Sequence, residues 1–372
     1  MKLSILVIGT QNPRIRDFFS QVARYANVTY LDVEPIGRIP QLRRLLKSWR
    51  WSQNAGEIPQ ATLLVPRRWN QVSAFLSNWF CRRRFSRTGT PDVVVFTWPH
   101  HAYLAEKLSD LTRVYYCKDP FEYWTWGADY IRPYETRLLE NVDAVFAVSR
   151  LIVSDFQPRT SAKLFYLPNG VCDWFLGDTS PRPADLPTDQ PLIGSVGEIN
   201  RDYDWDYVQA IVKALPQVRF CFLGRLHDPA PQANREISNI FRSNPNMLLL
   251  GWRDYQLMPA YMRSFDILMN FLRADAFGDR RSPLRLYDYL TTDRPIISTP
   301  VREAHEHLPH IHIAKDPGEA ILLIREILAG RRSPDIPARR NYIASHSWHA
   351  RAKEFLAEVE KLVGAKRERS QP

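Results

Sequence analysis

Short apolar runs alternate with longer amphipathic stretches through the first half of the chain, and this alternation constrains the fold more than any other feature. The runs are rich in valine and isoleucine and lie at residues 3–9, 28–32, 61–66, 92–97, 113–117 and 144–148. Such a pattern is typical of βαβ units, in which amphipathic helices connect the strands of a parallel sheet. The first half therefore predicts an α/β domain with a doubly wound sheet.

A turn separates this domain from a second one of the same kind. After an apolar run at 163–167 the chain reads Pro168-Asn169-Gly170, and a segment rich in Asp and Pro, interpreted as a linker, follows up to Pro191. Apolar runs return at residues 192–196, 219–223, 247–250, 266–270, 295–298 and 311–314. Since 372 residues also exceed what one hydrophobic core usually serves, we expect two Rossmann-like domains, at 1–175 and 176–345.

The end of the chain, residues 346–372, predicts one more helix. Four apolar side chains recur there at helical spacing and share one face: Phe355, Leu356, Val359 and Leu362. We expect this face to pack back toward the N-terminal domain, and the basic tail at 366–369 to stay solvated.

Composition indicates a globular protein without a disulfide framework or a zinc site. Hydrophobic residues make up 45% of the chain and charged residues 24%, both ordinary values. The run at 3–9 is too short to span a membrane and lacks a small-residue cleavage pattern, so we expect a cytoplasmic protein. The four cysteines stand far apart without paired spacing: Cys81, Cys117, Cys172 and Cys221.

The net charge of +10 favours an anionic partner, such as nucleic acid, acidic lipid or a phosphorylated ligand. Charge alone does not choose among these three. Nucleic acid is not expected, because no recognised nucleic-acid-binding module accompanies the basic residues.

The second half contains a series of motifs that resembles one enzyme family. Residues 193–200 read Ile-Gly-Ser-Val-Gly-Glu-Ile-Asn, residues 250–252 read Leu-Gly-Trp, and residues 282–290 read Ser-Pro-Leu-Arg-Leu-Tyr-Asp-Tyr-Leu. The last block is similar to the Ser-Pro-x-Lys-x-x-Glu-Tyr-x-Ala pattern of bacterial GT-B glycosyltransferases of the teichuronic-acid and exopolysaccharide type. The resemblance covers most of the second half and extends weakly to residues 115–119, 145–149 and 167–171.

This resemblance implies the GT-B fold, with two Rossmann-like domains facing a central cleft. It also implies transfer of a sugar from a nucleotide-diphosphate sugar to a hydroxyl of a glycan or lipid-linked acceptor, in cell-surface polysaccharide or glycolipid biosynthesis. No cofactor or metal is expected, because the nearest Asp-x-Asp sequence, Asp202-Tyr203-Asp204, opens a predicted helix. The rival hypotheses are a noncatalytic GT-B protein that binds a nucleotide sugar or glycan or scaffolds a partner, and a sugar-nucleotide epimerase.

The block at 282–290 predicts the residues that bind the diphosphate and the ribose of the nucleotide. Ser282 is a natural N-cap and Pro283 a natural first helical residue, followed by Leu284, so the helix through Leu290 should aim free N–H groups at the cleft and its diphosphate. Arg285 stands where the family has Lys and offers a forked cation to the phosphate oxygens. Asp288 replaces the family's Glu, which looks like the acceptor for a ribose hydroxyl. The alternatives are a plain helix start and a solvated ion pair between Arg285 and Asp288.

Residues of the neighbouring loops are further candidates for donor binding. A glycine after the strand at 192–196 would let the backbone approach the phosphates, and two polar residues follow it. An arginine precedes the predicted helix and could add positive charge. A Trp-Arg pair follows the strand at 247–250, where relatives hold the nucleobase. These residues are Gly197, Asn200, Arg201, Arg281, Trp252 and Arg253. The alternatives are an ordinary turn, a solvated basic loop and a packed surface Trp.

Three residues are candidates for the base that takes the acceptor proton. Asp119 follows the strand at 113–117, and inverting relatives have their base in a similar Tyr-x-Cys-x-Asp setting. His100 and His101 follow the strand at 92–97 at the same predicted edge. The alternatives are a turn Asp before Pro120, solvated loop histidines, and a retaining reaction in which the leaving phosphate takes the proton.

Two segments interleave basic residues with aromatic and aliphatic ones, at 38–51 and at 79–87. Basic residues beside Trp and Leu on one helix suit an anionic membrane surface, which an enzyme with lipid-linked acceptors would contact. Peripheral attachment to the inner face of the cytoplasmic membrane is therefore one hypothesis. An ordinary crossover helix with a basic outer face is the other.

Overall fold

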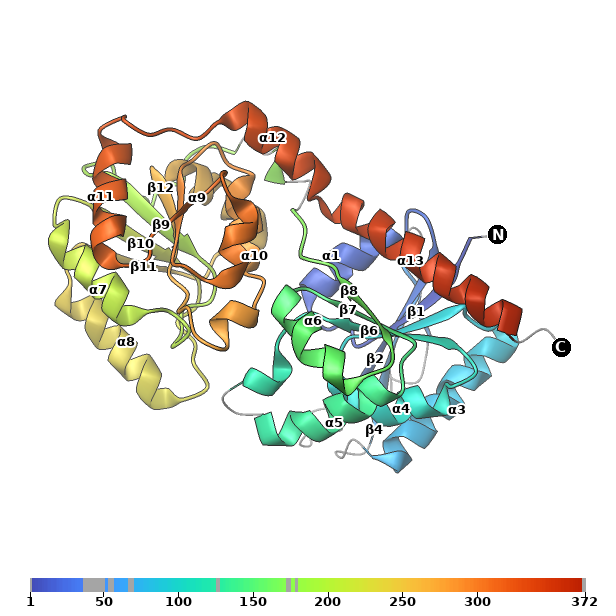
Figure 1. Cartoon of the computed structure of the whole chain (residues 1–372). Helices are drawn as coiled ribbons and strands as arrows, with labels where there is room; N and C mark the ends of the chain where they lie inside the picture. The colour runs from blue at the N-terminus through green and yellow to red at the C-terminus, as the bar shows by residue number, and fades with distance from the viewer. Residues whose placement is uncertain are drawn as a thin grey trace. The chain divides into compact units, whose positions relative to one another are not determined.

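The computed structural model describes residues 2–35, 51–52, 57–65, 70–124, 128–171, 175–177 and 180–369 (Figure 1). It divides into two compact units. The first comprises Met1–Asn169 together with Trp348–Pro372, and the second comprises Gly170–Ser347. Each unit has its own sheet, so each is described by itself.

The first boundary lies at the turn 168–170, six residues before the predicted one, and the segment interpreted as a linker belongs largely to the second unit. Polar contacts hold this segment there. Asp185 accepts hydrogen bonds from Arg253 and Tyr261, at 2.7 Å and 2.8 Å, and Arg182 donates to the carbonyl of Ser264 at 3.1 Å. Such long-range pairs have no signature in local composition.

The first unit has an eight-stranded sheet in the order β3-β4-β2-β1-β5-β6-β7-β8. All neighbouring strands are parallel except β3, which pairs with β4 antiparallel at the edge. The bounds are β1 Ser4–Ile8, β2 Asn27–Pro35, β3 Trp51–Ser52, β4 Gln60–Val65, β5 Val93–Phe96, β6 Thr112–Cys117, β7 Ala144–Ala147 and β8 Lys163–Tyr166.

Helices cover this sheet, which explains its continuous apolar runs. Every residue of β5 and β7 is buried, as expected for parallel strands covered on both faces. Among the described residues, this unit contains the α-helices α1 Pro13–Val22, α3 Gln71–Thr88, α4 Ala102–Lys107, α5 Ala128–Glu140, α6 Arg150–Phe156 and α13 Trp348–Arg369. In the described part of the chain no helix combines the length and the apolar character needed to cross a membrane.

The second unit has a six-stranded, all-parallel sheet in the order β11-β10-β9-β12-β13-β14. The strands are β9 Leu192–Val196, β10 Arg219–Leu223, β11 Met247–Gly251, β12 Ile267–Asn270, β13 Ile296–Ser298 and β14 His312–Ile313. The helices are α7 Trp205–Ala214, α8 Pro231–Ser243, α9 Met258–Ser264, α10 Leu284–Leu290, α11 Pro317–Leu328 and α12 Ile336–Ser345. The predicted α/β class, with a doubly wound sheet in each half, is confirmed.

The C-terminal helix α13 packs on the first unit, beside α1 (Figure 1). Phe355 lies at its centre and is fully buried. Its ring is 5.6 Å from that of Phe18 on α1 and 4.8 Å from that of Phe146 on β7, measured between centroids. The helix thus completes the core of the unit in which the chain begins.

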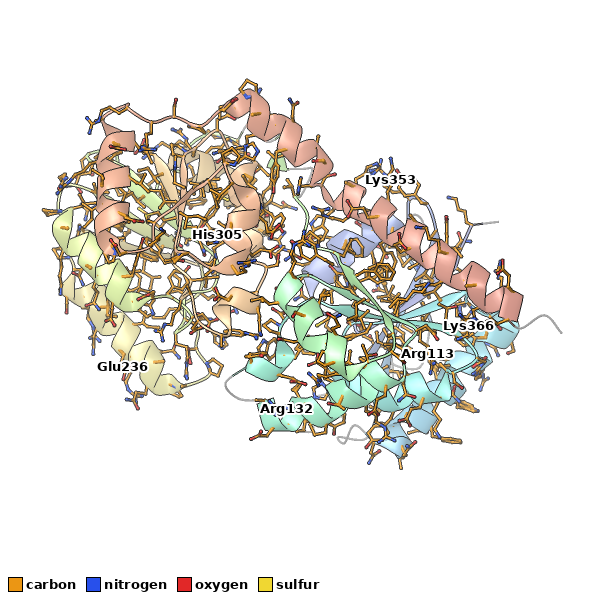
Figure 2. All side chains as sticks on the ribbon, viewed as in Figure 1. Arg113, Arg132, Glu236, His305, Lys353 and Lys366 are labelled. Carbon is orange, nitrogen blue, oxygen red and sulfur yellow. The ribbon has the colours of Figure 1, made fainter. Side chains whose placement is uncertain are left out.

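Polar contacts fix the far end of α13. Lys366 and Arg113 lie on the same side of the unit (Figure 2), and both reach the carboxylate of Asp143, Lys366 Nζ at 3.3 Å and Arg113 Nε at 3.7 Å. Lys366 also donates to the carbonyl of Leu111 at 2.6 Å. The expectation that the basic tail stays solvated is therefore wrong for Lys366, because its ammonium group binds the end of β6.

We expect Phe355→Ala to destabilise the first unit. Truncating a fully buried Phe removes apolar contacts and leaves a cavity, which costs about 3–5 kcal/mol. Urea denaturation followed by circular dichroism measures the loss. Glu360→Ala, an exposed change on the same helix, is the matched control and should stay within about 0.5 kcal/mol of wild type. Equal losses in both variants would contradict a core role for α13.

Candidate functional site

The strand order of the second unit defines where a ligand can bind. In the sheet, β10 and β11 lie on one side of β9. The chain then crosses over, so that β12, β13 and β14 lie on the other side of β9. At such a crossover the connections after the two central strands leave in opposite directions and open a crevice at the strands' carboxyl ends. The residues that follow β9 and β12 therefore form the candidate donor site.

Gly197 and Arg285 meet at this crevice. Gly197 follows β9 directly and has a φ of 125°, which residues with a side chain rarely adopt. A Cβ atom at this position would lie 3.0 Å from Nη2 of Arg285, on α10. Glycine is thus required here by backbone geometry and by the guanidinium that lies against it. The structure brings together two residues that the sequence placed in separate motifs.

Tyr203 holds the guanidinium of Arg285 in this position. Its hydroxyl accepts a hydrogen bond from Nη1 of Arg285 at 2.5 Å, and its ring lies 4.9 Å from the guanidinium carbon, within the range of a cation–π contact. Tyr203 is itself buried, with its hydroxyl 3.2 Å from that of Ser195 on β9. The arginine is therefore preorganised, and Nη2 is the part of its fork that faces Gly197.

The predicted start of the phosphate helix needs a correction. α10 begins at Leu284 with Pro283 as the preceding cap residue, and no side chain caps its N–H groups. Ser282 does not act as the N-cap, because its hydroxyl donates to Glu303 Oε1 at 3.3 Å and lies 3.4 Å from the Tyr287 hydroxyl. The first N–H groups of α10 are consequently left uncapped by side chains.

Asp288 lies on α10 one turn after Arg285 and is buried. A solvated ion pair between these two residues, one of the alternatives, does not fit this burial. Asp288 keeps its predicted place on the helix that carries Arg285. Its contact with a ribose stays a prediction.

Three other predicted arginines are held by carboxylates of their own unit. Arg201 binds Asp228 through Nε at 2.8 Å and Nη2 at 2.5 Å, and these hydrogen bonds lower the pKa of Asp228 to about 2. Arg281 binds Asp202 at 2.8 Å. Arg253 binds Asp185 at 2.7 Å, as described above. These contacts indicate structural roles, because each guanidinium already has its counter-charge.

Trp252 and Asn200 differ in their surroundings. Trp252 follows β11 with 56% of its surface exposed, and the guanidinium of Arg225 lies 5.7 Å from its ring. An exposed indole of this kind suits stacking on a flat ring. Asn200 is used locally, since its side chain accepts from the N–H of Asp202 at 3.0 Å and its carbonyl accepts from the indole of Trp205 at 2.9 Å.

The first unit has the same kind of crossover, between β1 and β5. Gly9 follows β1 with a φ of 90°, and a Cβ atom there would lie 2.8 Å from Thr97 Oγ1 and 2.9 Å from Trp98 Cδ1. Thr97 follows β5 and donates its hydroxyl to the carbonyl of Gly9 at 2.5 Å. The crevice of the first unit is therefore bounded by Gly9 and by residues 97–101.

His100 and His101 lie in this loop, in the short 3₁₀ helix Pro99–His101. Burial lowers the pKa of His100 to about 4, and burial together with the charge of His100 lowers that of His101 to about 3. Both imidazoles are neutral at pH 7. A general base works best with a pKa near the working pH, and the pKa values of both histidines lie below it.

Asp119 follows β6, the neighbour of β5, and so lies at the same carboxyl edge of the sheet. Its backbone carbonyl accepts hydrogen bonds from Phe121 N at 2.9 Å and from the thiol of Cys117 at 3.3 Å. Next to it, Lys118 Nζ lies 4.5 Å from the ring centre of Trp98, and burial lowers the pKa of Lys118. A carboxylate, an amine and an indole are thus grouped at this edge.

The sequence did not reveal Tyr203, Gly9 or Lys118 as site residues. Tyr203 is noted in the sequence only as the middle residue of Asp202-Tyr203-Asp204, and its hydrogen bond with Arg285 spans 82 residues. Gly9 did carry a signal, a glycine at the end of the first strand in a doubly wound domain. Among the described residues, no three His, Cys, Asp or Glu side chains are grouped so that they could hold a metal.

Comparison with known proteins adds to this geometry. Residues 201–357 match a family model described as glycosyl transferase-like. This range contains Tyr203, Arg285 and Asp288. No curated protein matches the sequence.

Solved structures match almost the whole chain at low identity. A sucrose-phosphate synthase from Thermosynechococcus elongatus has a TM-score of 0.73 and 15% identity, over 98% of this chain and 100% of that one. An α,α-trehalose 6-phosphate synthase from Burkholderia multivorans has 0.72 and 12%, over 98% and 100%. A trehalose-6-phosphate structure from E. coli, bound with UDP-2-fluoro glucose, has 0.70 and 11%, over 96% and 99%.

The structural matches bear on the fold, and the family match bears on the second unit. The structural matches extend through both units, so the expected GT-B fold is confirmed. The family match shows that the second unit resembles a glycosyl transferase domain. The teichuronic-acid and exopolysaccharide type is not distinguished by either comparison.

Proposed function

We propose that this protein transfers a sugar from a nucleoside diphosphate sugar to a hydroxyl acceptor, and that Arg285 and the uncapped start of α10 hold the diphosphate. The contact of Arg285 with Gly197 is the observation that carries the proposal. It places a preorganised cation at the carboxyl edge between β9 and β12, where doubly wound sheets bind their ligands.

This arrangement suits the chemistry of the transfer. The diphosphate carries two negative charges, and the departure of the nucleotide develops more charge on the leaving phosphate. A guanidinium and free N–H groups already aimed at that position stabilise the developing charge without reorganising. The UDP-2-fluoro glucose in the E. coli neighbour supports a nucleoside diphosphate sugar as the donor class.

The first experiment measures nucleotide binding by thermal shift and calorimetry with UDP, GDP and ADP. One of these should raise the melting temperature of the wild type, because a ligand bound to the folded state stabilises it. Arg285→Ala should weaken this binding about tenfold to a hundredfold, since a charge-assisted hydrogen bond is worth roughly 1.5–3 kcal/mol.

Arg331→Ala is the matched control, because Arg331 is an exposed arginine of the same unit outside the crevice. It should bind the nucleotide like wild type. Unchanged nucleotide affinity in Arg285→Ala would contradict the proposed donor site. No binding of any nucleoside diphosphate by wild type would favour a noncatalytic GT-B protein.

We assign the base to Asp119. The place of Asp119 at the carboxyl edge of β6, the neighbour of β5, supports this choice. Asp119 would accept the hydroxyl proton of the acceptor as that oxygen attacks the anomeric carbon, while the nucleoside diphosphate leaves. Lys118 stands beside it at the same edge.

Asp119→Asn should lower turnover by about a hundredfold or more, because general base catalysis contributes roughly 10²–10⁴-fold. Its affinity for the nucleotide should equal that of wild type, since Asp119 lies in the other unit. Turnover is measured as acceptor-dependent consumption of the donor. His100→Ala is the comparison and should keep most of its activity. The reverse ranking of the two variants would move the base to the histidine loop.

A lipid-linked acceptor at the inner face of the cytoplasmic membrane is the finer proposal, in keeping with a role in cell-surface polysaccharide or glycolipid synthesis. The segment at 38–51 lies outside the described residues, apart from a short strand at its end. The segment at 79–87 lies on α3, where Phe75 is 62% and Trp79 48% exposed, one helical turn apart. The guanidinium of Arg83 lies 5.5 Å from the Trp79 ring. Exposed rings beside basic residues suit an anionic bilayer surface.

Sedimentation with vesicles tests this surface. Wild type should bind phosphatidylcholine vesicles that contain phosphatidylserine more strongly than vesicles without it. Phe75→Ser and Trp79→Ser should each weaken binding about tenfold, since burying such a side chain is worth roughly 1.5–3 kcal/mol. Leu322→Ser, at an exposed leucine of α11, is the control. Equal effects of all three changes would contradict the proposed surface.

A further inference from the structure

A second cavity lies within the second unit, away from the crevice described above. Its volume is about 740 Å³, which is in the range of small-molecule sites. The residues that line it come from α9, from the end of α10 and the loop after it, and from α12. Four of them are arginines: Arg263, Arg294, Arg339 and Arg340.

Arg339 is the most unusual of these residues. It is only 2% exposed, and its guanidinium donates to the carbonyls of Thr292 at 2.9 Å, Arg294 at 2.7 Å and His310 at 2.7 Å. Its Nε has no hydrogen-bond partner among the described residues, and no described carboxylate forms an ion pair with it. Burial lowers its pKa to about 10. The charge of Asp293 partly offsets this burial, although Asp293 forms its ion pair with Arg340.

The charges around the cavity do not balance. Of the described residues that line it, Asp293 is the one carboxylate, and it pairs with Arg340 at 3.2 Å, at a largely exposed position. Arg294 uses its Nε to bind the carbonyl of Arg263 at 2.8 Å. Arg294 and Arg339 are therefore lining cations that form no ion pair among the described residues, and an anionic ligand would offset their charge.

Apolar side chains also line the cavity. Leu290, Ile336 and Ile343 border the same cavity. Guanidinium groups match the oxygens of a phosphate in charge and in geometry. An apolar wall beside them adds room for a hydrocarbon portion.

This cavity and the donor crevice lie at opposite edges of the sheet. Arg285 is in the first turn of α10, beside the carboxyl end of β9, whereas Leu290 is its last residue. Arg294 lies just before β13, at the amino end of that strand. A ligand of the cavity would therefore not overlap with a nucleotide bound at Gly197.

We propose that this arginine-lined cavity is a second ligand site, which binds an organic phosphate: a phosphoester group held by Arg294 and Arg340, attracted also by the buried charge of Arg339, with an apolar portion against Leu290, Ile336 and Ile343. The site is separate from the donor site in its residues and in the edge of the sheet that it uses. Binding there is reversible and involves no covalent step.

Calorimetric titration of the full chain with monomeric octyl phosphate tests the proposal. Wild type should bind it, and Arg340→Glu and Arg294→Gln should each weaken binding at least tenfold. Arg340 is 69% exposed at its side chain, so its substitution should leave the fold intact. Arg339 is unsuitable as the first variant, because its three carbonyl contacts support the fold. The unchanged binding of a nucleoside diphosphate shows that each variant is folded.

Arg331→Glu is the matched control, because it makes the same charge change in the same unit outside the cavity. It should bind octyl phosphate like wild type, and so should Arg285→Ala. The proposal is overturned if wild type does not bind octyl phosphate, or if Arg331→Glu weakens binding as much as Arg340→Glu. Equal affinity for octanoate would overturn the phosphate assignment, and equal affinity for glycerol 3-phosphate would overturn the apolar portion.

Discussion

The contact between Arg285 and the backbone at Gly197 sets the form of the candidate donor site. A side chain at 197 would occupy the space of the guanidinium, and without Tyr203 the guanidinium would lose both its hydrogen-bond acceptor and the ring beneath it. Tyr289, four residues after Arg285 on the same helix, also serves this edge, because its hydroxyl accepts from the N–H of Val196 at 2.7 Å. One helix thus fixes both the cation and the end of the strand that faces it.

The strands could be predicted from the sequence because parallel strands that are covered on both faces consist of continuous runs of apolar residues. Val93–Phe96 and Leu192–Val196, for example, lie within or coincide with predicted runs. The boundary between the units was harder to place. The segment before Pro191 looks like a linker by composition, whereas the contacts of Asp185 and Arg182 tie it to the second unit.

Less of the site could be predicted, because charged side chains choose partners that are distant in sequence. In the sequence, Arg201 and Arg285 are both candidate cations for donor binding. In the structure, Arg201 binds the carboxylate of Asp228, whereas Arg285 binds the hydroxyl of Tyr203. Ser282 has the residue type of a helix cap, but Glu303, 21 residues later, attracts its hydroxyl. Resemblance to a family led to α10, the helix that carries Arg285. Only the packing shows which of its side chains are committed elsewhere.

The return of α13 to the first unit makes the second unit an insertion within the first. The chain enters the second unit near Val171 and leaves it near Ser347, and these two points are adjacent. Val171 pairs with Ser347, and the N–H of Val171 donates to the carbonyl of His346 at 2.9 Å. During synthesis the second unit, continuous in sequence, has all its residues before the first unit has its last helix. Phe18 and Phe146 gain their contact with Phe355 only after the second unit has been made, so the core of the unit that is made first is completed by residues from the end of the chain.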